Sequence, residues 1–215
     1  MPFEVYDYRT DVRNVVITPE IRSRFMRMEP GTVAPGHTHD LGHEVFLVLE
    51  GQAEFEIDGE RAVLGPGQMC FARTDQNHVV RVVGDKPMTM YLSVTPHLEP
   101  THTRWGPDGQ KLPPQYGGAT ARERAANPTP PPPVAELVER HVAATGALAE
   151  AARRSAAVQE EAVAALRQAL AAGDGAAAKA AIDAMWAGIY QASRAFYEMG
   201  AAWNELAARA ANPTP

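Results

Sequence analysis

The chain has a single cysteine, Cys70, among its 215 residues, so it cannot form an internal disulfide. A reducing cytoplasm is the compartment that this cysteine usage predicts. The N-terminal residues lack the basic start and apolar core of a secretory signal, and no apolar run is long enough to span a bilayer. Basic runs of five or more residues are also missing, and the net charge is -6. We therefore expect a soluble cytoplasmic protein with neither a nucleic-acid nor a membrane partner.

Residues 1–96 contain many short runs of β-branched and aromatic residues, separated by Gly, Pro and Asp. Such runs without intervening helical periods predict an antiparallel sandwich or barrel, of which the jelly roll is one form. Asp58-Gly59 lies between two of these runs and is a strong two-residue hairpin signal. The expected strands are Val12–Thr18, Ile21–Met28, Glu44–Glu50, Ala53–Ile57, Arg61–Leu64, Gln68–Phe71, His78–Val83 and Met88–Thr95.

Three residues close together in the sequence predict a metal site. His37 and His39 are two residues apart on an expected strand, so their side chains point the same way. A tight turn through residues 40–42 then returns Glu44 beside them. Two imidazoles and a carboxylate form an incomplete metal site. His78, at the start of another expected strand, is a candidate for the fourth ligand.

This spacing resembles that of the cupin superfamily. The first cupin motif, Gly-x5-His-x-His-x4-Glu-x6-Gly, is matched in full by Gly31, His37, His39, Glu44 and Gly51. The second motif, Gly-x5-Pro-x-Gly-x2-His-x3-Asn, is matched by Gly67 and His78 and departs at Arg73, Asp75 and Val82. The resemblance covers roughly residues 20–96. It implies a cupin jelly-roll barrel that binds one divalent transition metal (Fe, Mn, Ni, Cu or Zn) through His37, His39, Glu44 and His78.

The same resemblance implies a metal-dependent enzyme acting on a small organic molecule, most readily an oxygenase. If Glu44 faces the metal, strand parity also turns Phe46 and Val48 inward. With Met26 and Met28 they are expected to shape an apolar substrate pocket, and Glu44 is the candidate proton acceptor. A non-catalytic, metal-bound module that binds or senses a small molecule is the alternative, and an isomerase is a third reading. Fold alone does not choose among these activities.

The remaining polar candidates receive weaker assignments. His43 precedes Glu44 and is expected to point away from the metal. Arg24 shares parity with Met26, so it either binds a substrate anion inside the barrel or lies at the rim. His97 and His102 are expected to be exposed, with folding of their segment over the barrel mouth as the less favoured possibility. Cys70 is expected to be a small buried apolar residue rather than a reactive thiol.

Composition predicts three regions: a cupin barrel at 1–100, an extended arm and Pro-rich linker at 101–133, and a helical hairpin at 134–212. In the third region 30 of 79 residues are Ala, which favours helix, and Gly173-Asp174-Gly175 divides it into two helices. The second helix carries a broad apolar band: Met185, Trp186, Ile189, Tyr190, Phe196, Tyr197 and Trp203. One Ala-rich partner is too thin to cover it, so we expect a homodimer or larger homo-oligomer formed through the hairpin. The predicted fold class is thus mainly β plus α, an antiparallel jelly-roll barrel followed by a long helical hairpin.

Overall fold

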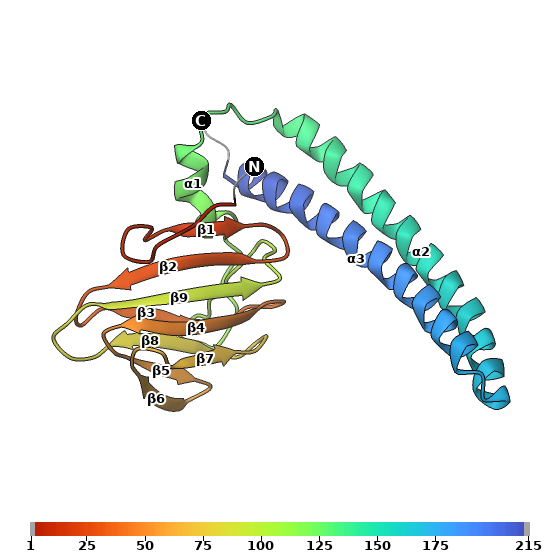
Figure 1. Cartoon of the computed structure of the whole chain (residues 1–215). Helices are drawn as coiled ribbons and strands as arrows, with labels where there is room; N and C mark the ends of the chain where they lie inside the picture. Colours follow the sequence, from red (N-terminus) through yellow and green to blue (C-terminus); the bar gives the residue numbers. More distant parts are fainter. Residues whose placement is uncertain (1–2, 213–215) are drawn as a thin grey trace. The chain divides into compact units, whose positions relative to one another are not determined.

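The computed structural model describes residues 3–212 and divides them into a β-rich part and a helical part (Figure 1). The strands are β1 Asn14–Ile17, β2 Arg22–Met28, β3 Val33–His37, β4 His43–Glu50, β5 Ala53–Ile57, β6 Glu60–Leu64, β7 Met69–Ala72, β8 His78–Val82 and β9 Met88–Thr95. A 3₁₀ turn at Gly118–Thr120 and three helices follow: α1 Ala121–Ala126, α2 Val134–Ala172 and α3 Gly175–Ala210.

The strands form two antiparallel sheets that enclose one hydrophobic core. One sheet has the order β1-β2-β9-β4-β7 and the other the order β3-β8-β5-β6. Inward residues from both sheets, such as Phe46, Phe55, Val80 and Met90, pack together with little exposure. The antiparallel barrel expected from the sequence is confirmed, and the expected ranges of β5 and β9 agree with the structure at both ends.

The turn between β5 and β6 shows why the local sequence gives a tight hairpin. Asp58 and Gly59 both have positive φ, 49° and 86°. A two-residue turn of this kind matches the twist of the strands on either side, and Asp-Gly tolerates the left-handed backbone well. The register Ile57↔Glu60 follows directly from the turn.

Register across three neighbouring strands sets the inner wall of the five-stranded sheet. The successive rows on β4, β9 and β2 are Glu44–Val94–Arg22, Phe46–Leu92–Arg24 and Val48–Met90–Met26. Side chains alternate along each strand, so all three rows face the barrel interior. The first row contains two charged side chains, the second contains one and the third contains none. The charged side chains therefore lie towards one end of the barrel and the apolar core towards the other.

Helices α2 and α3 form the antiparallel hairpin that the sequence predicts. Gly173 ends α2 in the left-handed conformation with φ 67°, which allows the chain to reverse before α3 begins. The pairing of the helices is visible in the ring contact of His141 with Trp203 and in the hydrogen bond from Gln159 to the Met185 carbonyl. No helix in the described part of the chain combines the length and the apolar character needed to cross a membrane.

The described chain forms two compact units. One consists of the residues up to 130 together with those from 207 onward, and the other of residues 131–206. The change from one unit to the other at residue 130 falls at the start of the proline run 130–133. The sequence Arg-Ala-Ala-Asn-Pro occurs twice, at 124–128 and at 209–213, and a helix ends within each copy: α1 at Ala126 and α3 at Ala210.

Candidate metal centre

Four side chains from three strands and one turn meet inside the polar end of the barrel. His37 ends β3 and faces His78 at the start of β8, and the two are direct register partners. His39 follows two residues after His37, and Glu44 is the second residue of β4. His39, Glu44 and His78 are each at most 3% exposed. One ligand atom from each of the four residues lies within 4.8 Å of all the others.

The spacing of these atoms fits a single metal ion. Glu44 Oε2 lies 3.0 Å from both His39 Nε2 and His78 Nε2, and 3.8 Å from His37 Nε2. The Nε2 atoms of His37 and His78 are 3.1 Å apart. Neighbouring ligands at bond lengths of about 2.1 Å stand about 3.0 Å apart at right angles and about 3.4 Å apart at the tetrahedral angle. The four residues therefore fit the coordination shell of one transition metal.

Backbone carbonyls orient the three imidazoles. The Nδ1 atoms of His37 and His78 lie 3.1 Å and 2.9 Å from the carbonyl oxygens of Pro35 and Gln76, and His39 Nδ1 contacts the carbonyl of Thr101. A carbonyl oxygen only accepts, so each Nδ1 carries the hydrogen and each Nε2 keeps a lone pair. This arrangement holds metal-binding histidines in the required tautomer.

The charge state of Glu44 suits the same site. Complete burial would raise the pKa of its carboxyl, but the surrounding side chains of His37, His39 and His78 outweigh burial and hold the pKa well below its ordinary value. The carboxylate is therefore ionised at neutral pH. Three lone pairs and one anionic oxygen meet without enough hydrogens between them, and a cation is the group that relieves this repulsion.

The turn between His39 and Glu44 depends on a glycine. A Cβ at Gly42 would lie 2.7 Å from Val94 Cγ1 and 3.1 Å from the Pro96 carbonyl, so a larger residue would displace the turn. The next residue, His43, is exposed and its Nδ1 accepts a hydrogen bond from the Thr74 amide at 3.2 Å. It points away from the cluster, as strand parity predicts.

The expectation that His97 and His102 are exposed is wrong. His97 is 1% exposed, and His102 is half-buried. The segment carrying them, which we call the arm (residues 97–115), returns to the barrel mouth because Thr38 and Thr103 exchange two backbone hydrogen bonds of 3.0 Å and 2.8 Å. The only feature of the sequence that pointed to this burial was a pair of histidines five residues apart, in a stretch without helix or strand periodicity.

The arm continues along the mouth through side-chain contacts. The Trp105 indole donates to Thr38 Oγ1 at 3.2 Å, and Asp40 accepts from Thr103 Oγ1 at 2.7 Å and from Lys111 Nζ at 3.1 Å. Thr38 and Asp40, which bind the arm, follow directly after the ligand candidates His37 and His39 in the sequence. The same short segment therefore supplies metal-ligating side chains and the attachment point of the arm.

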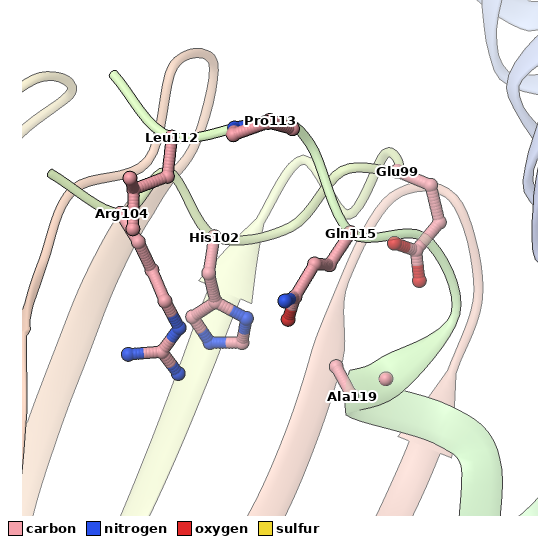
Figure 2. Close-up of a pocket in the computed structure, with 8 residues that line it drawn as sticks. Glu99, His102, Arg104, Leu112, Pro113, Gln115 and Ala119 are labelled. Carbon is pink, nitrogen blue, oxygen red and sulfur yellow. The ribbon is translucent and has the colours of Figure 1, made fainter. Parts of the chain in front are cut away.

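His102 lies between the four-residue cluster and a cavity. Its ring centroid is 4.7 Å from that of His37 and 5.1 Å from that of His39, comparable with the spacing of the cluster's own rings. On the other side, His102 lines a cavity of about 320 Å³ with Glu99, Arg104, Leu112, Pro113, Gln115, Gly118 and Ala119. Figure 2 shows the side chains of His102, Arg104 and Gln115 extending from the arm in the same direction.

The four residues expected to form an apolar pocket lie in the packed core. Met28, Phe46 and Val48 are at most 4% exposed, and Met26 packs against the same cluster. Phe46 contacts the His78 ring at a centroid distance of 5.6 Å and so supports a ligand directly. The cavity beside His102 is lined mainly by arm residues instead, so a pocket made of the four core residues stays a prediction. Cys70 is partly buried, and burial raises the pKa of its thiol to about 11, which leaves it unreactive at neutral pH.

The buried state of His97 predicts a loss of stability in acid. Burial, with smaller effects from Arg22 and His39, lowers the pKa of His97 from 6.5 to about 4. Between these values the unfolded chain binds a proton that the folded chain does not, so the free energy of unfolding falls as the pH falls. We expect His97→Gln to remove about 1–3 kcal/mol of this loss.

Urea unfolding of the chelator-treated protein at pH 7, 5.5 and 4.5 measures this effect. The exposed residue His43 provides the matched control, and His43→Gln should leave the pH slope of the wild type unchanged. Equal slopes in the wild type and in His97→Gln would contradict the assignment of a neutral, buried His97.

Comparison with known proteins agrees with this geometry. Residues 24–95, which run from β2 to β9 and contain all four cluster residues, match the family model of the cupin domain. Residues 24–95 of the barrel are therefore similar to a cupin domain.

The individual relatives match only part of the chain. Polyketide synthase CurC of Streptomyces cyaneus is 33% identical over 69 residues, which are 32% of this chain and 45% of that protein, so the match spans less than half of the relative. An uncharacterised protein with a double-stranded β-helix domain from Klebsiella pneumoniae is 22% identical over 44% of this chain and 91% of its own, with a TM-score of 0.42. TT1209 from Thermus thermophilus is 23% identical over 44% of this chain and 98% of its own, also with a TM-score of 0.42.

Proposed function

We propose that the chain is a metal-dependent enzyme that acts on a small organic molecule by an oxygenase-type reaction. The observation that supports it most is the meeting of three imidazole Nε2 atoms and one carboxylate oxygen in a buried site. His37, His39, Glu44 and His78 would hold one divalent ion of Fe, Mn, Ni, Cu or Zn, all of which accept imidazole and carboxylate ligands. When bound, such an ion supplies Lewis acidity or one-electron chemistry.

Glu44 would also act as a proton acceptor. Within the described residues, its contacts with the three histidines all involve Oε2, which leaves Oε1 for a second role. The carboxylate is ionised at neutral pH, and an ionised oxygen beside a bound substrate can take a proton from a hydroxyl or an acidic C–H group.

The cavity beside His102 would admit the substrate. It is lined by polar groups at Glu99, His102 and Arg104 and by apolar groups at Leu112 and Pro113, a mixture that suits an organic molecule with oxygen substituents. The similarity of the barrel to a protein named as a polyketide synthase component supports a small organic substrate in general terms.

Oxygen uptake tests the catalytic proposal. We expect the wild-type protein, loaded with Fe(II) or Mn(II), to consume oxygen in the presence of at least one member of a panel of enolic and phenolic compounds. Glu44→Gln should reduce this rate by about 100-fold or more, because it removes both an anionic ligand and the proton acceptor. An oxygen electrode measures the rate, and metal analysis of the same samples separates loss of metal from loss of chemistry.

A second candidate function is metal-dependent binding or sensing of a small molecule without turnover. It is favoured by the helical hairpin, a long unit separate from the barrel that the ligand cluster does not need. Compounds of the panel that bind to the loaded protein without oxygen uptake or chemical change would support this candidate. An isomerase would change the compound without consuming oxygen.

We also propose that the hairpin associates with a second copy of the chain. Ile182, Trp186, Ile189 and Tyr190 follow helical spacings of three and four on α3 and are each at least 45% exposed. On a single helix these positions lie on one side, so they form an apolar stripe that one partner helix does not cover. A second hairpin in a two-fold arrangement supplies the same stripe and gives a four-helix bundle.

A further inference from the structure

Two arginines face the interior of the barrel beside the ligand cluster. Arg22 and Arg24 are two residues apart on β2, so their side chains lie on the same face. Across β9, Arg22 is in the row of Glu44 and Arg24 is in the row of Phe46. Two strand spacings separate β2 from β4, so the backbones at Arg22 and Glu44 are about 10 Å apart.

These guanidinium groups are poorly satisfied by the protein. Arg22 is 1% exposed, and its Nη1 donates to Asn14 Oδ1 at 3.3 Å, while its Nε is buried without a hydrogen-bond partner. Arg24 is partly buried, its Nε is also buried without a partner, and it makes no ion pair with any residue that the structure describes. A buried donor without a partner is destabilising, and a charged one more so.

A purely structural role does not explain Arg24 well. An apolar side chain at this position would continue the packed row of Leu92 and Phe46 without the cost of burying a charge. Burial lowers the pKa of both guanidinium groups, and the charges of Glu44 and Glu123 partly oppose this lowering for both, with Glu99 in addition for Arg22. The guanidiniums remain charged at neutral pH, because the ordinary pKa of arginine is above 12.

The carboxylates that act on the two arginines are Glu44, Glu99 and Glu123, and Arg122 adds a further positive charge beside Arg24. With a divalent ion at the ligand cluster, the positive charges would outnumber these carboxylates. An anion bound beside Arg24 would offset part of this excess, and a guanidinium binds a carboxylate through two parallel hydrogen bonds.

Resting on the proposed function, we propose that Arg24, with Arg22 beside it, binds the carboxylate of a small organic acid that also reaches the ligand cluster. Arg24 is the residue that touches the substrate, because no hydrogen bond or ion pair with a described residue holds its guanidinium, whereas Asn14 holds that of Arg22. Arg22 is a positioning residue that is held by Asn14 and raises the positive potential at the site. The substrate class is therefore small carboxylic acids.

Calorimetric titration of the metal-loaded, full-length protein tests this assignment with matched probes: acetate, malonate and benzoate against acetamide, malonamide and benzamide. We expect at least one acid to bind about 10-fold or more tightly than its amide, because a charged hydrogen bond is lost in the amide. Arg24→Gln should abolish this preference, and Arg24→Lys should restore part of it. Arg27→Gln is the matched control, because Arg27 lies on the same strand, is exposed and pairs with Glu29 at 3.4 Å.

Metal analysis of every sample separates this inference from the proposed function. Equal binding of each acid and its amide by the wild type, or an unchanged preference in Arg24→Gln, would overturn the anion site even if the metal is present. A charge preference that depends on Arg24 in protein without metal would support the anion site and count against the metal-dependent function. Because the comparison of acids with amides uses the wild type, a folding defect in a variant does not remove the test.

Discussion

His78→Ala is expected to remove nearly all of the bound metal, with a loss of metal affinity of more than about 100-fold. Loss of groups that only support a ligand already costs about 10–100-fold, and His78 is itself a ligand candidate. Its Nε2 lies 3.0 Å from Glu44 Oε2 and 3.1 Å from His37 Nε2, so its removal opens one side of the cluster. His37→Ala and His39→Ala should behave in the same way. Elemental analysis of the purified proteins, with competitive chelator titration, measures the effect.

The matched control for these variants is His43→Ala. His43 is adjacent in sequence to Glu44, yet it is exposed and hydrogen-bonded to the Thr74 amide on the other side of the strand. Its replacement should leave one metal per chain. If His43→Ala lost the metal while His39→Ala retained it, the parity of β4 and the proposed ligand set would both be wrong.

Trp186→Glu is expected to convert a dimer of this protein into a monomer. Trp186 is 63% exposed and lies at the centre of the stripe with Ile182, Ile189 and Tyr190. A glutamate there would place a charge inside the proposed four-helix interface, where it has no partner and desolvation is costly. Light scattering should change from at least twice 23.2 kDa to a value near 23.2 kDa.

Two further measurements make the oligomer test specific. Metal content should be unchanged in Trp186→Glu, because the ligand cluster belongs to the other compact unit. Trp203 contacts His141 inside the hairpin, so Trp203→Glu should lower helical stability rather than separate folded chains. A wild-type protein that is monomeric at tens of micromolar would contradict the proposal of a second copy on this stripe.

Local sequence predicted those parts of the molecule that depend on short-range geometry. The barrel strands, the Asp58-Gly59 turn and the division of the helices at Gly173 follow from alternation, turn chemistry and helix-ending residues. The meeting of His37, His39 and Glu44 follows from their spacing around a tight turn, and His78 was a candidate from its place at the start of an expected strand, which the family pattern then supported. These features were accessible because each is set by residues within one turn or by a motif of fixed spacing.

Long-range packing decided the rest. The arm has no periodicity, so nothing in its sequence shows that Thr103 pairs with Thr38 or that His102 comes to lie against His37. The sequence left two positions open for Arg24, the barrel rim and the barrel interior. Strand parity determines which face of the sheet a side chain is on, but not which groups surround it there. The sequence alone determined the barrel, the hairpin and the four clustered residues, whose placement depends on local periodicity and spacing. Only the tertiary structure, through pairing of distant segments, determined the closure of the barrel mouth, the buried histidines and the unpaired interior arginine.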